Sequence, residues 1–188
     1  MTFTYWGKPL EVFCHMYNCT WLNERGAELA VYDQWRDTGP LLEVGNVLNH
    51  YEQFARPHRV IDRYEEAVGV ENIDVFDLDG QHPQIVAIST LEHVRWDEEP
   101  REDGGGQAAI EHLASLLAPG GRMLVTIPTG HNPPLDEFLA TGAGADRACT
   151  LVRDMTSWRQ TDEPEFRPYA VTQAWAEAVW VGEFSCAS

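Results

Sequence analysis

The stretch LLAPGGRMLVTIPTGHNP, residues 116–133, contains a helix end, a sharp turn and a buried strand in direct succession. Residues 107–121 carry apolar side chains at helical spacing and end in Pro-Gly-Gly, a run that stops helices. The apolar run 122–128 that follows predicts a strand. Asn132 and Pro133 then fit the cap and the first turn of another helix.

Strands and helices alternate on both sides of this stretch. We predict strands at 40–44, 58–62, 72–76, 83–89, 122–128, 147–153 and 173–184, and a helix at 21–35 with Asn23 as its N-cap. This alternation indicates a parallel sheet covered on both faces. The last two strands have no helix between them, so we expect them to pair antiparallel at one edge. Only residues 77–83 connect the third and fourth strands, which leaves room for no more than a bare turn.

Composition and charge exclude several classes of protein. Hydrophobic residues make up 44% of the 188-residue chain, which is enough for one folded domain with a sizeable core. The formal charge of −17 repels phosphate backbones, so we expect no nucleic-acid partner. The sequence shows no signal peptide, no run of membrane-span length, and no metal or disulfide spacing among its four cysteines. We therefore expect a cytoplasmic protein with reduced cysteines and no membrane partner.

Five segments together resemble the class I S-adenosylmethionine-dependent methyltransferases over nearly the whole chain. They are LLEVGNVLNHY (41–51), RVIDRYE (59–65), IDVFDL (73–78), IVAISTLEHV (85–94) and the stretch at 116–133. The resemblance implies an α/β fold with a Rossmann-like seven-stranded sheet, mostly parallel with a C-terminal antiparallel strand pair and with helices on both faces. We expect a single domain, 1–188, in which 1–38 form an N-terminal helical cover and 39–188 form the core. EVGNVLNHY, STLEHVRWDE and PTGHNPPLD resemble a small-molecule branch of the family, found in sugar and secondary-metabolite pathways.

The candidate cofactor-binding residues follow the ends of the predicted strands, where open α/β sheets bind their ligands. Gly45 leaves the first strand where the backbone must turn sharply and approach a ligand without a Cβ atom. Asp62 ends the second strand, where a carboxylate can accept both ribose hydroxyls of S-adenosylmethionine. The other candidates are Glu43 and Asn46 around the first turn, Asp74 and Val75 beside the adenine, and Ser89, Thr90 and Leu91 beside the methionyl arm.

The first turn has a single glycine, where a dinucleotide-binding loop has several. Those glycines are needed because the pyrophosphate of a dinucleotide binds in close contact with the backbone at the helix N-terminus. S-adenosylmethionine has no phosphate, so Gly45 can suffice if Asn46 supplies hydrogen bonds. The missing fingerprint also argues against NAD as the cofactor.

Four residues are candidates for the acceptor side of the site. His131 and His93 lie beyond the fifth and fourth strands and can remove a proton from an attacking hydroxyl, since a histidine pKa lies near neutral pH. Tyr17 and Arg25 precede the sheet, in a region that closes over the cofactor in related small-molecule enzymes. Arg25 can bind the methionyl carboxylate or an acidic acceptor, or alternatively form a surface salt bridge with Glu24 or Glu28.

The sequence leaves structural alternatives open for several of these residues. Asp62 can instead cap a helix, Asp74 competes with nearby acids, Glu43 can hydrogen-bond the turn, and His93 can pack or bond to the backbone. No metal site is expected, because acids and histidines do not cluster at ligand spacing along the chain.

We therefore predict transfer of a methyl group from S-adenosylmethionine to an oxygen or nitrogen of a small metabolite, a sugar or natural-product intermediate, with S-adenosylhomocysteine as product. The alternative is a catalytically inactive binding or scaffold protein that keeps the fold. The sequence also leaves a homodimer open.

Overall fold

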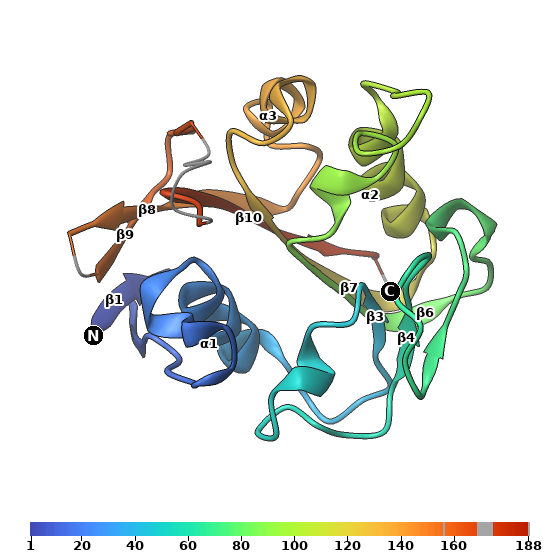
Figure 1. Cartoon of the computed structure of the whole chain (residues 1–188), viewed down its shortest axis with the longest axis horizontal. Coiled ribbons are helices and arrows are strands. Elements are labelled where there is room, and N and C mark those ends of the chain that lie inside the picture. Colours follow the sequence, from blue (N-terminus) through green and yellow to red (C-terminus); the bar gives the residue numbers. More distant parts are fainter. Residues whose placement is uncertain (156, 169–174, 188) are drawn as a thin grey trace.

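The computed structural model describes residues 1–155, 157–168 and 175–187, and its centre is an eight-stranded sheet (Figure 1). The strand order is β5-β4-β3-β6-β7-β10-β8-β9. The strands are β3 (Leu42–Val44), β4 (Arg59–Ile61), β5 (Val70–Glu71), β6 (His82–Ile88), β7 (Leu117–Pro128), β8 (Arg147–Asp154), β9 (Ser157–Thr161) and β10 (Ala178–Ser185). The chain runs outward from β3 to β5 and then returns to β6 on the other side of β3. The strand order therefore reverses between β3 and β6.

The pairing of the strands confirms the predicted mixed sheet. The strands from β5 to β7 pair in parallel, and β10 lies antiparallel between β7 and β8. Strand β9 pairs antiparallel with β8 and forms an eighth, unpredicted strand at the edge. The predicted strand 173–184 corresponds to β10, although its first two residues lie outside the described part of the chain.

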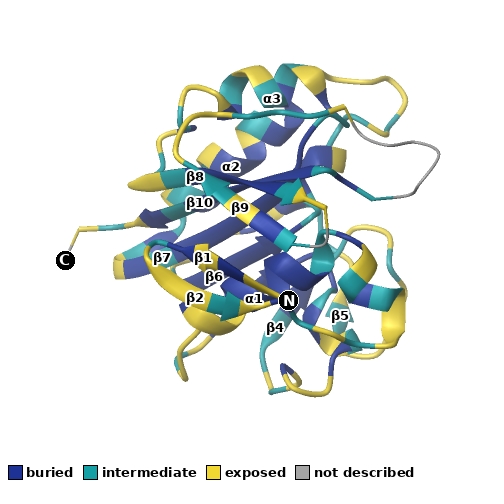
Figure 2. Cartoon of the chain, turned by 90° about the vertical axis from the view of Figure 1, so that its left-hand side faces the viewer, coloured by how far each residue is buried: buried dark blue, intermediate teal, exposed yellow. Residues whose placement is uncertain are grey.

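Helices cover both faces of the sheet, as predicted. Figure 1 shows α1 (Arg25–Trp35) on one side and α2 (Gly105–Ser115) and α3 (Pro133–Leu139) on the other. Along β6, Val86 and Ile88 join the core around α1, whereas Ile85 and Ala87 join the core around α2 and α3. Successive side chains of a strand point to opposite faces, so a wholly apolar strand has to be covered twice. Figure 2 accordingly shows the middle of the sheet as buried.

The ends of the helices follow local capping. The prediction of Asn23 as N-cap is wrong by one residue: α1 begins at Arg25 with Glu24 as its N-cap, although Asn23 Oδ1 accepts the Arg25 N–H at 3.1 Å. Residues 17–22 form separate 3-10 turns, η1 (Tyr17–Leu22), with a kink at Asn18 and Cys19. Asn132 accepts the Leu135 N–H at 3.1 Å and caps α3, with Pro133 in its first turn, as predicted. The Pro-Gly-Gly run lies within β7, which begins earlier than predicted.

Two segments differ from the prediction for local reasons. The predicted strand 72–76 is wrong: β5 ends at Glu71, and Asp74 accepts the Phe76 N–H and caps a 3-10 helix, η3 (Val75–Asp77). This short helix is the only one among the described residues between β5 and β6, as the short connection predicted. The helical cover predicted over 1–38 is wrong for its first residues, which form a hairpin of β1 (Thr2–Tyr5) and β2 (Lys8–Glu11) that turns at Trp6 and Gly7 with positive φ angles.

Among the described residues, the remaining helices are two short 3-10 turns at the carboxyl ends of β3 and β6. They are η2 (Leu48–His50) and η4 (Leu91–His93). No helix in the described part of the chain is long and apolar enough to cross a membrane.

Candidate functional site

A pocket of about 870 Å³, measured with its mouth open to solvent, lies at the carboxyl ends of β3, β4, β5 and β6. This is where the strand order reverses, the usual ligand site of open α/β sheets. Eight of the predicted site residues line it: Gly45, Asn46, Asp62, Asp74, Val75, Ser89, Thr90 and His93. Glu43, Leu91, Tyr17, Arg25 and His131 lie outside its lining.

Gly45 occupies a position that no other residue fits. Its φ angle is +84°, and a Cβ atom would lie 2.2 Å from Thr90 Oγ1. Its N–H donates to the Ile61 carbonyl of β4 at 2.8 Å, which fixes the turn. The end of β3 therefore packs directly against the end of β6, and the backbone forms the pocket wall.

Glu43 supports this turn from inside the protein. It is 1% exposed, and its Oε1 accepts the N–H groups of Val47 and Leu48 at 2.8 and 2.7 Å. Its Oε2 lies 2.7 Å from Nε2 of His58, and the other ring nitrogen of His58 bonds to the Arg56 carbonyl. Burial lowers the pKa of His58, but the bonds to the carboxylate and the carbonyl outweigh it and raise the pKa above its usual value. Both partners are acceptors, so the imidazolium form, which donates from both nitrogens, fits this site.

Asp62 is held in place by one of its oxygens. Oδ1 accepts the N–H groups of Tyr64 and Glu65, both at 2.8 Å, so this oxygen organises the turn after β4. Oδ2 has no hydrogen-bond partner among the described residues. Asn46 lies nearby, with its amide donating to Glu65 at 2.6 Å. No α-helix begins here, so the helix-capping alternative for Asp62 is wrong.

Asp74 is more heavily engaged than Asp62. Oδ1 accepts the Phe76 N–H, and Oδ2 receives Arg95 at 2.8 Å and Arg63 at 3.0 Å. Both arginines also reach Glu98 at 2.9 Å. The carboxylate of Asp74 thus belongs to a four-residue ion-pair network in the pocket wall, while the neighbouring Val75 is buried and supplies an apolar surface.

Three predicted cofactor-binding residues, Ser89, Thr90 and Leu91, follow β6 and lie in different environments. Ser89 has a φ of +45°, and its hydroxyl donates to Glu28 at 2.7 Å. Thr90 donates its hydroxyl to the Ile88 carbonyl and faces Gly45. Leu91 is buried in the core around α2, away from the pocket lining.

A group of buried charges beneath this strand end was not predicted. Glu28 is fully buried, and its Oε2 lies 3.6 Å from Arg25 Nη1, so the expected surface salt bridge is instead an interior one. Glu92 is 2% exposed, and burial raises its pKa well above the usual value. Burial and the charge of Glu28 also raise the pKa of Glu24 to about 6. Arg25 Nη1, Glu28 Oε2 and Glu92 Oε2 are buried without hydrogen-bond partners, which marks a polar interior between α1 and η4.

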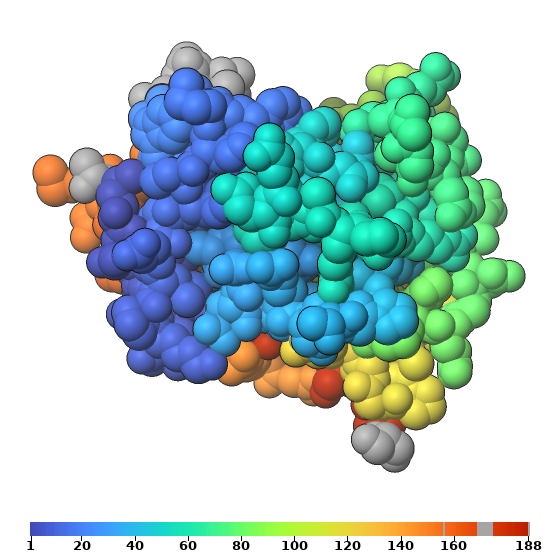
Figure 3. Space-filling model, turned by 90° about the horizontal axis from the view of Figure 1, so that it is seen from below, coloured from blue at the N-terminus to red at the C-terminus, as the bar shows by residue number. Residues whose placement is uncertain are grey.

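Tyr17 lies against the loop that follows β3. Its ring stacks on His50 with centroids 4.7 Å apart and meets Tyr51 edge-on at 5.7 Å. Seen from below, the N-terminal segment and the segment after β3 form neighbouring parts of one surface (Figure 3). The N-terminal region therefore contacts the loop that forms the pocket wall.

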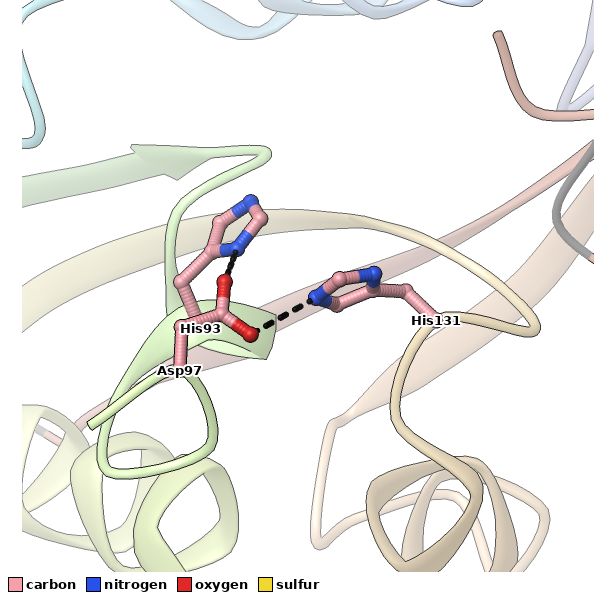
Figure 4. Close-up of side chains that lie close together, drawn as sticks. All are labelled: His93, Asp97 and His131. Carbon is pink, nitrogen blue, oxygen red and sulfur yellow. Dashed lines mark hydrogen bonds and ion pairs between the residues drawn. The ribbon is translucent and has the colours of Figure 1, made fainter. Parts of the chain in front are cut away.

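His93 and His131 come together through Asp97, which the sequence had not singled out. His93 Nδ1 lies 2.5 Å from Asp97 Oδ2, and His131 Nε2 lies 3.3 Å from Asp97 Oδ1 (Figure 4). Partial burial pushes the pKa of Asp97 up, but the two imidazoles outweigh it and hold the pKa below its usual value. The expectation that acids and histidines do not cluster is wrong for these three residues, whose ligand atoms lie within 4.8 Å of one another.

Comparison with known proteins identifies the fold. No protein-family model and no curated protein matches the sequence. The structure is similar to the N-methyltransferase NodS of Bradyrhizobium japonicum in complex with S-adenosyl-L-homocysteine, with a TM-score of 0.54 and 11% identity over 86% of this chain and 85% of NodS. It is also similar to a SAM-dependent methyltransferase of Thermotoga maritima, with a TM-score of 0.51 and 11% identity over 86% of this chain and 87% of the other. The chain has the fold of the class I S-adenosylmethionine-dependent methyltransferases.

Proposed function

We propose that the pocket binds S-adenosylmethionine and that the protein transfers its methyl group to an oxygen or nitrogen of a small metabolite. Asp62 carries the proposal: one oxygen is fixed by two backbone amides and the other has no partner among the described residues, at the end of β4 in the pocket wall. A carboxylate held in this way is suited to accept the two ribose hydroxyls through charge-assisted hydrogen bonds. The likeness to NodS, solved in complex with S-adenosyl-L-homocysteine, supports the same occupant.

The other pocket residues fit parts of the same cofactor. The backbone at Gly45 lies beside the proposed ribose site, and Val75 offers an apolar face to the adenine. The side chain of Asn46 already donates to Glu65 and accepts from Asn49, so Asn46 supports the turn. Asp74 is less suited to the adenine amine than the sequence suggested, because both of its oxygens already accept hydrogen bonds from the protein. Glu43 acts through the turn that it holds, rather than by contact with the cofactor.

The methionyl arm extends toward the end of β6 in this proposal. Ser89 and Thr90 line that part of the pocket, and Leu91 supports them from the core. Arg25 is the proposed partner of the methionyl carboxylate; its Nη1 has no hydrogen bond, but it lies 3.6 Å from Glu28 Oε2 and outside the pocket lining, so it has to exchange this ion pair for the ligand. Tyr17 contributes to the acceptor side through the N-terminal cover.

The reaction is an in-line displacement in which the acceptor atom attacks the methyl carbon and the neutral sulfide leaves. Alignment of the three reacting atoms supplies most of the catalysis in such a transfer. For an oxygen acceptor, His93 is a suitable base because it lines the pocket and Asp97 holds its Nδ1; its Nε2, the nitrogen that takes the proton, lies 3.5 Å from Glu92 Oε1. His131 is the second candidate base. We propose a sugar or natural-product intermediate as the acceptor class.

The first experiment is calorimetric titration of the protein with S-adenosylhomocysteine and S-adenosylmethionine. We expect micromolar binding, abolished by Gly45→Arg, whose side chain has no space beside Thr90. Asp62→Asn should weaken binding by about 10-fold or more, because it removes the charge from hydrogen bonds worth about 1.5–3 kcal/mol. Asp77→Asn, an exposed acid outside the pocket lining, is the matched control and should bind as the wild type does.

Two outcomes contradict the proposal in different ways. A folded protein that binds neither ligand is not a methyltransferase of this kind. A protein that binds both ligands but transfers no methyl group to any member of an acceptor library supports the inactive binding protein instead.

A further inference from the structure

We propose that His93, Asp97 and His131 bind a divalent transition-metal ion at the acceptor side of the cofactor pocket. One ligand atom from each residue lies within 4.8 Å of the other two. Two imidazole nitrogens and one carboxylate oxygen suit zinc, iron and other first-row ions, whereas magnesium and calcium prefer oxygen ligands alone. The role of the ion in catalysis rests on the proposed function, but the binding of the ion does not.

The geometry needs little change to accept an ion. Asp97 lies between the two rings, with its oxygens 2.5 Å from His93 Nδ1 and 3.3 Å from His131 Nε2 (Figure 4). Two atoms bound to one tetrahedral ion at about 2.1 Å are about 3.4 Å apart. The side chains of His93 and Asp97 are 51% and 47% exposed, so small rotations can open the short contact between them. The ion then replaces their mutual hydrogen bonds.

The backbone that carries the three ligands is already held together. Asn132, which is 2% exposed, donates its amide to the carbonyl of Glu92 at 3.0 Å. This bond joins the residue after His131 to the residue before His93. The Asp97 N–H donates to the His93 carbonyl at 3.2 Å, which sets the turn between these two ligands. Hydrogen bonds therefore already hold the loops after β6 and β7 together at the site, so binding an ion requires little additional ordering of the backbone.

Three protein ligands leave coordination positions for an acceptor, and His93 also lines the cofactor pocket. An acceptor hydroxyl bound to the ion has a lowered pKa and loses its proton to solvent. Its oxygen then bonds to the methyl carbon while the carbon–sulfur bond breaks, and the electron pair of that bond remains on sulfur. The two histidines act as ligands in this state, and the ion replaces the general base. The inference therefore favours oxygen over nitrogen as the attacking atom.

The test uses Co²⁺ as a spectroscopic probe and Zn²⁺ for calorimetry, both without cofactor. We expect one ion per chain with micromolar affinity and a visible d–d spectrum. No thiolate-to-cobalt charge transfer should appear, which separates this site from the four cysteines. His131→Ala and Asp97→Asn should each weaken binding at least ~10-fold, since even residues that only support a ligand have effects of this size. His82→Ala is the control, because its ring bonds to the Asp79 carbonyl elsewhere on the protein.

Three results overturn the proposal: no binding of either ion, binding unchanged in His131→Ala and Asp97→Asn, or a thiolate band that disappears in Cys14→Ser. Cofactor binding is measured separately. Metal binding without S-adenosylhomocysteine binding contradicts the proposed function and leaves the metal site intact, and the reverse result contradicts only the metal site.

Discussion

We predict that adding one methyl group at Gly45 destabilises the protein strongly, and that the backbone and packing parts of this cost can be measured separately. In Gly45→Ala, the φ of +84° costs about 1–2 kcal/mol for a residue with a Cβ atom. The new atom also lies 2.2 Å from Oγ1 and 2.9 Å from Cγ2 of Thr90, and relieving such an overlap in a packed region costs about 1–3 kcal/mol. Together these two costs lower the free energy of unfolding of Gly45→Ala by about 2–5 kcal/mol. Replacing a glycine also restricts the unfolded chain, which offsets roughly 0.4–1 kcal/mol of this loss.

Gly80→Ala isolates the packing part of this cost. Gly80 has a φ of +87° and no atom within 4 Å of an added Cβ, so its backbone and unfolded-state contributions match those of Gly45. In urea unfolding at a fixed pH, Gly45→Ala should cost about 1–3 kcal/mol more than Gly80→Ala. Most of this excess should disappear when Gly45→Ala is made together with Thr90→Ala. Equal costs for the two glycines, or an excess that is the same with and without the Thr90 side chain, would refute the reasoning.

Three further predictions concern stability and reactivity. Because the His58 pKa is raised in the folded protein, the ion pair of His58 with Glu43 stabilises the fold fully below about pH 6.5, and this stabilisation is lost as the pH rises through the folded pKa. The free energy of unfolding, measured in urea, should therefore fall between pH 6 and 9, and it should fall less steeply in His58→Gln. Equal slopes for the two proteins would contradict this. Asn132→Ala should lower the free energy of unfolding by at least about 1–2 kcal/mol, because it removes both the α3 cap and the buried hydrogen bond to the Glu92 carbonyl; a thermal or urea transition unchanged from the wild type would contradict this. Burial raises the pKa of Cys149 to about 12, so iodoacetamide should label exposed Cys14 in the native protein and Cys149 only after unfolding, as mass spectrometry of the peptides can check.

The core of the sheet could be predicted because each strand carries its own signal. An apolar run such as 83–89 has to be buried on both faces wherever it lies, and it became β6 with small shifts at its ends. The prediction of a strand at 72–76 failed because the Asp74 carboxylate accepts the N–H of Phe76, two residues further on, and such a local bond favours a turn over a strand. The β1–β2 hairpin was missed because the resemblance led us to expect helices there, and because Trp6-Gly7 is not one of the dipeptides that typically mark a two-residue hairpin turn.

The site could be predicted only where its residues lie at the end of one strand. Gly45 and Asp62 each follow their own strand, so order along the chain was enough to find them. Asp97 and His131 are 34 positions apart, and Glu28 and Ser89 are 61 apart. These pairs meet only because β6 and β7 are parallel neighbours and α1 packs over the sheet. Spacing along the sequence carries no signal for such contacts, which is why the approach of His131 to His93 and Asp97 was not expected, although His93 and Asp97 are only four positions apart.

The hydrogen bonds of the backbone N–H groups after β3 explain why the first turn needs only one glycine. In a phosphate-binding loop, free backbone N–H groups face the ligand, and extra glycines let the phosphate approach them. Here the N–H groups of Val47 and Leu48 donate to Glu43 on the buried side of the turn. A phosphate would find these two amides already bonded to Glu43, whose charge is balanced by His58. The turn therefore offers a phosphate no free N–H at Val47 or Leu48, and Gly45 is needed for its positive φ and its contact with Thr90.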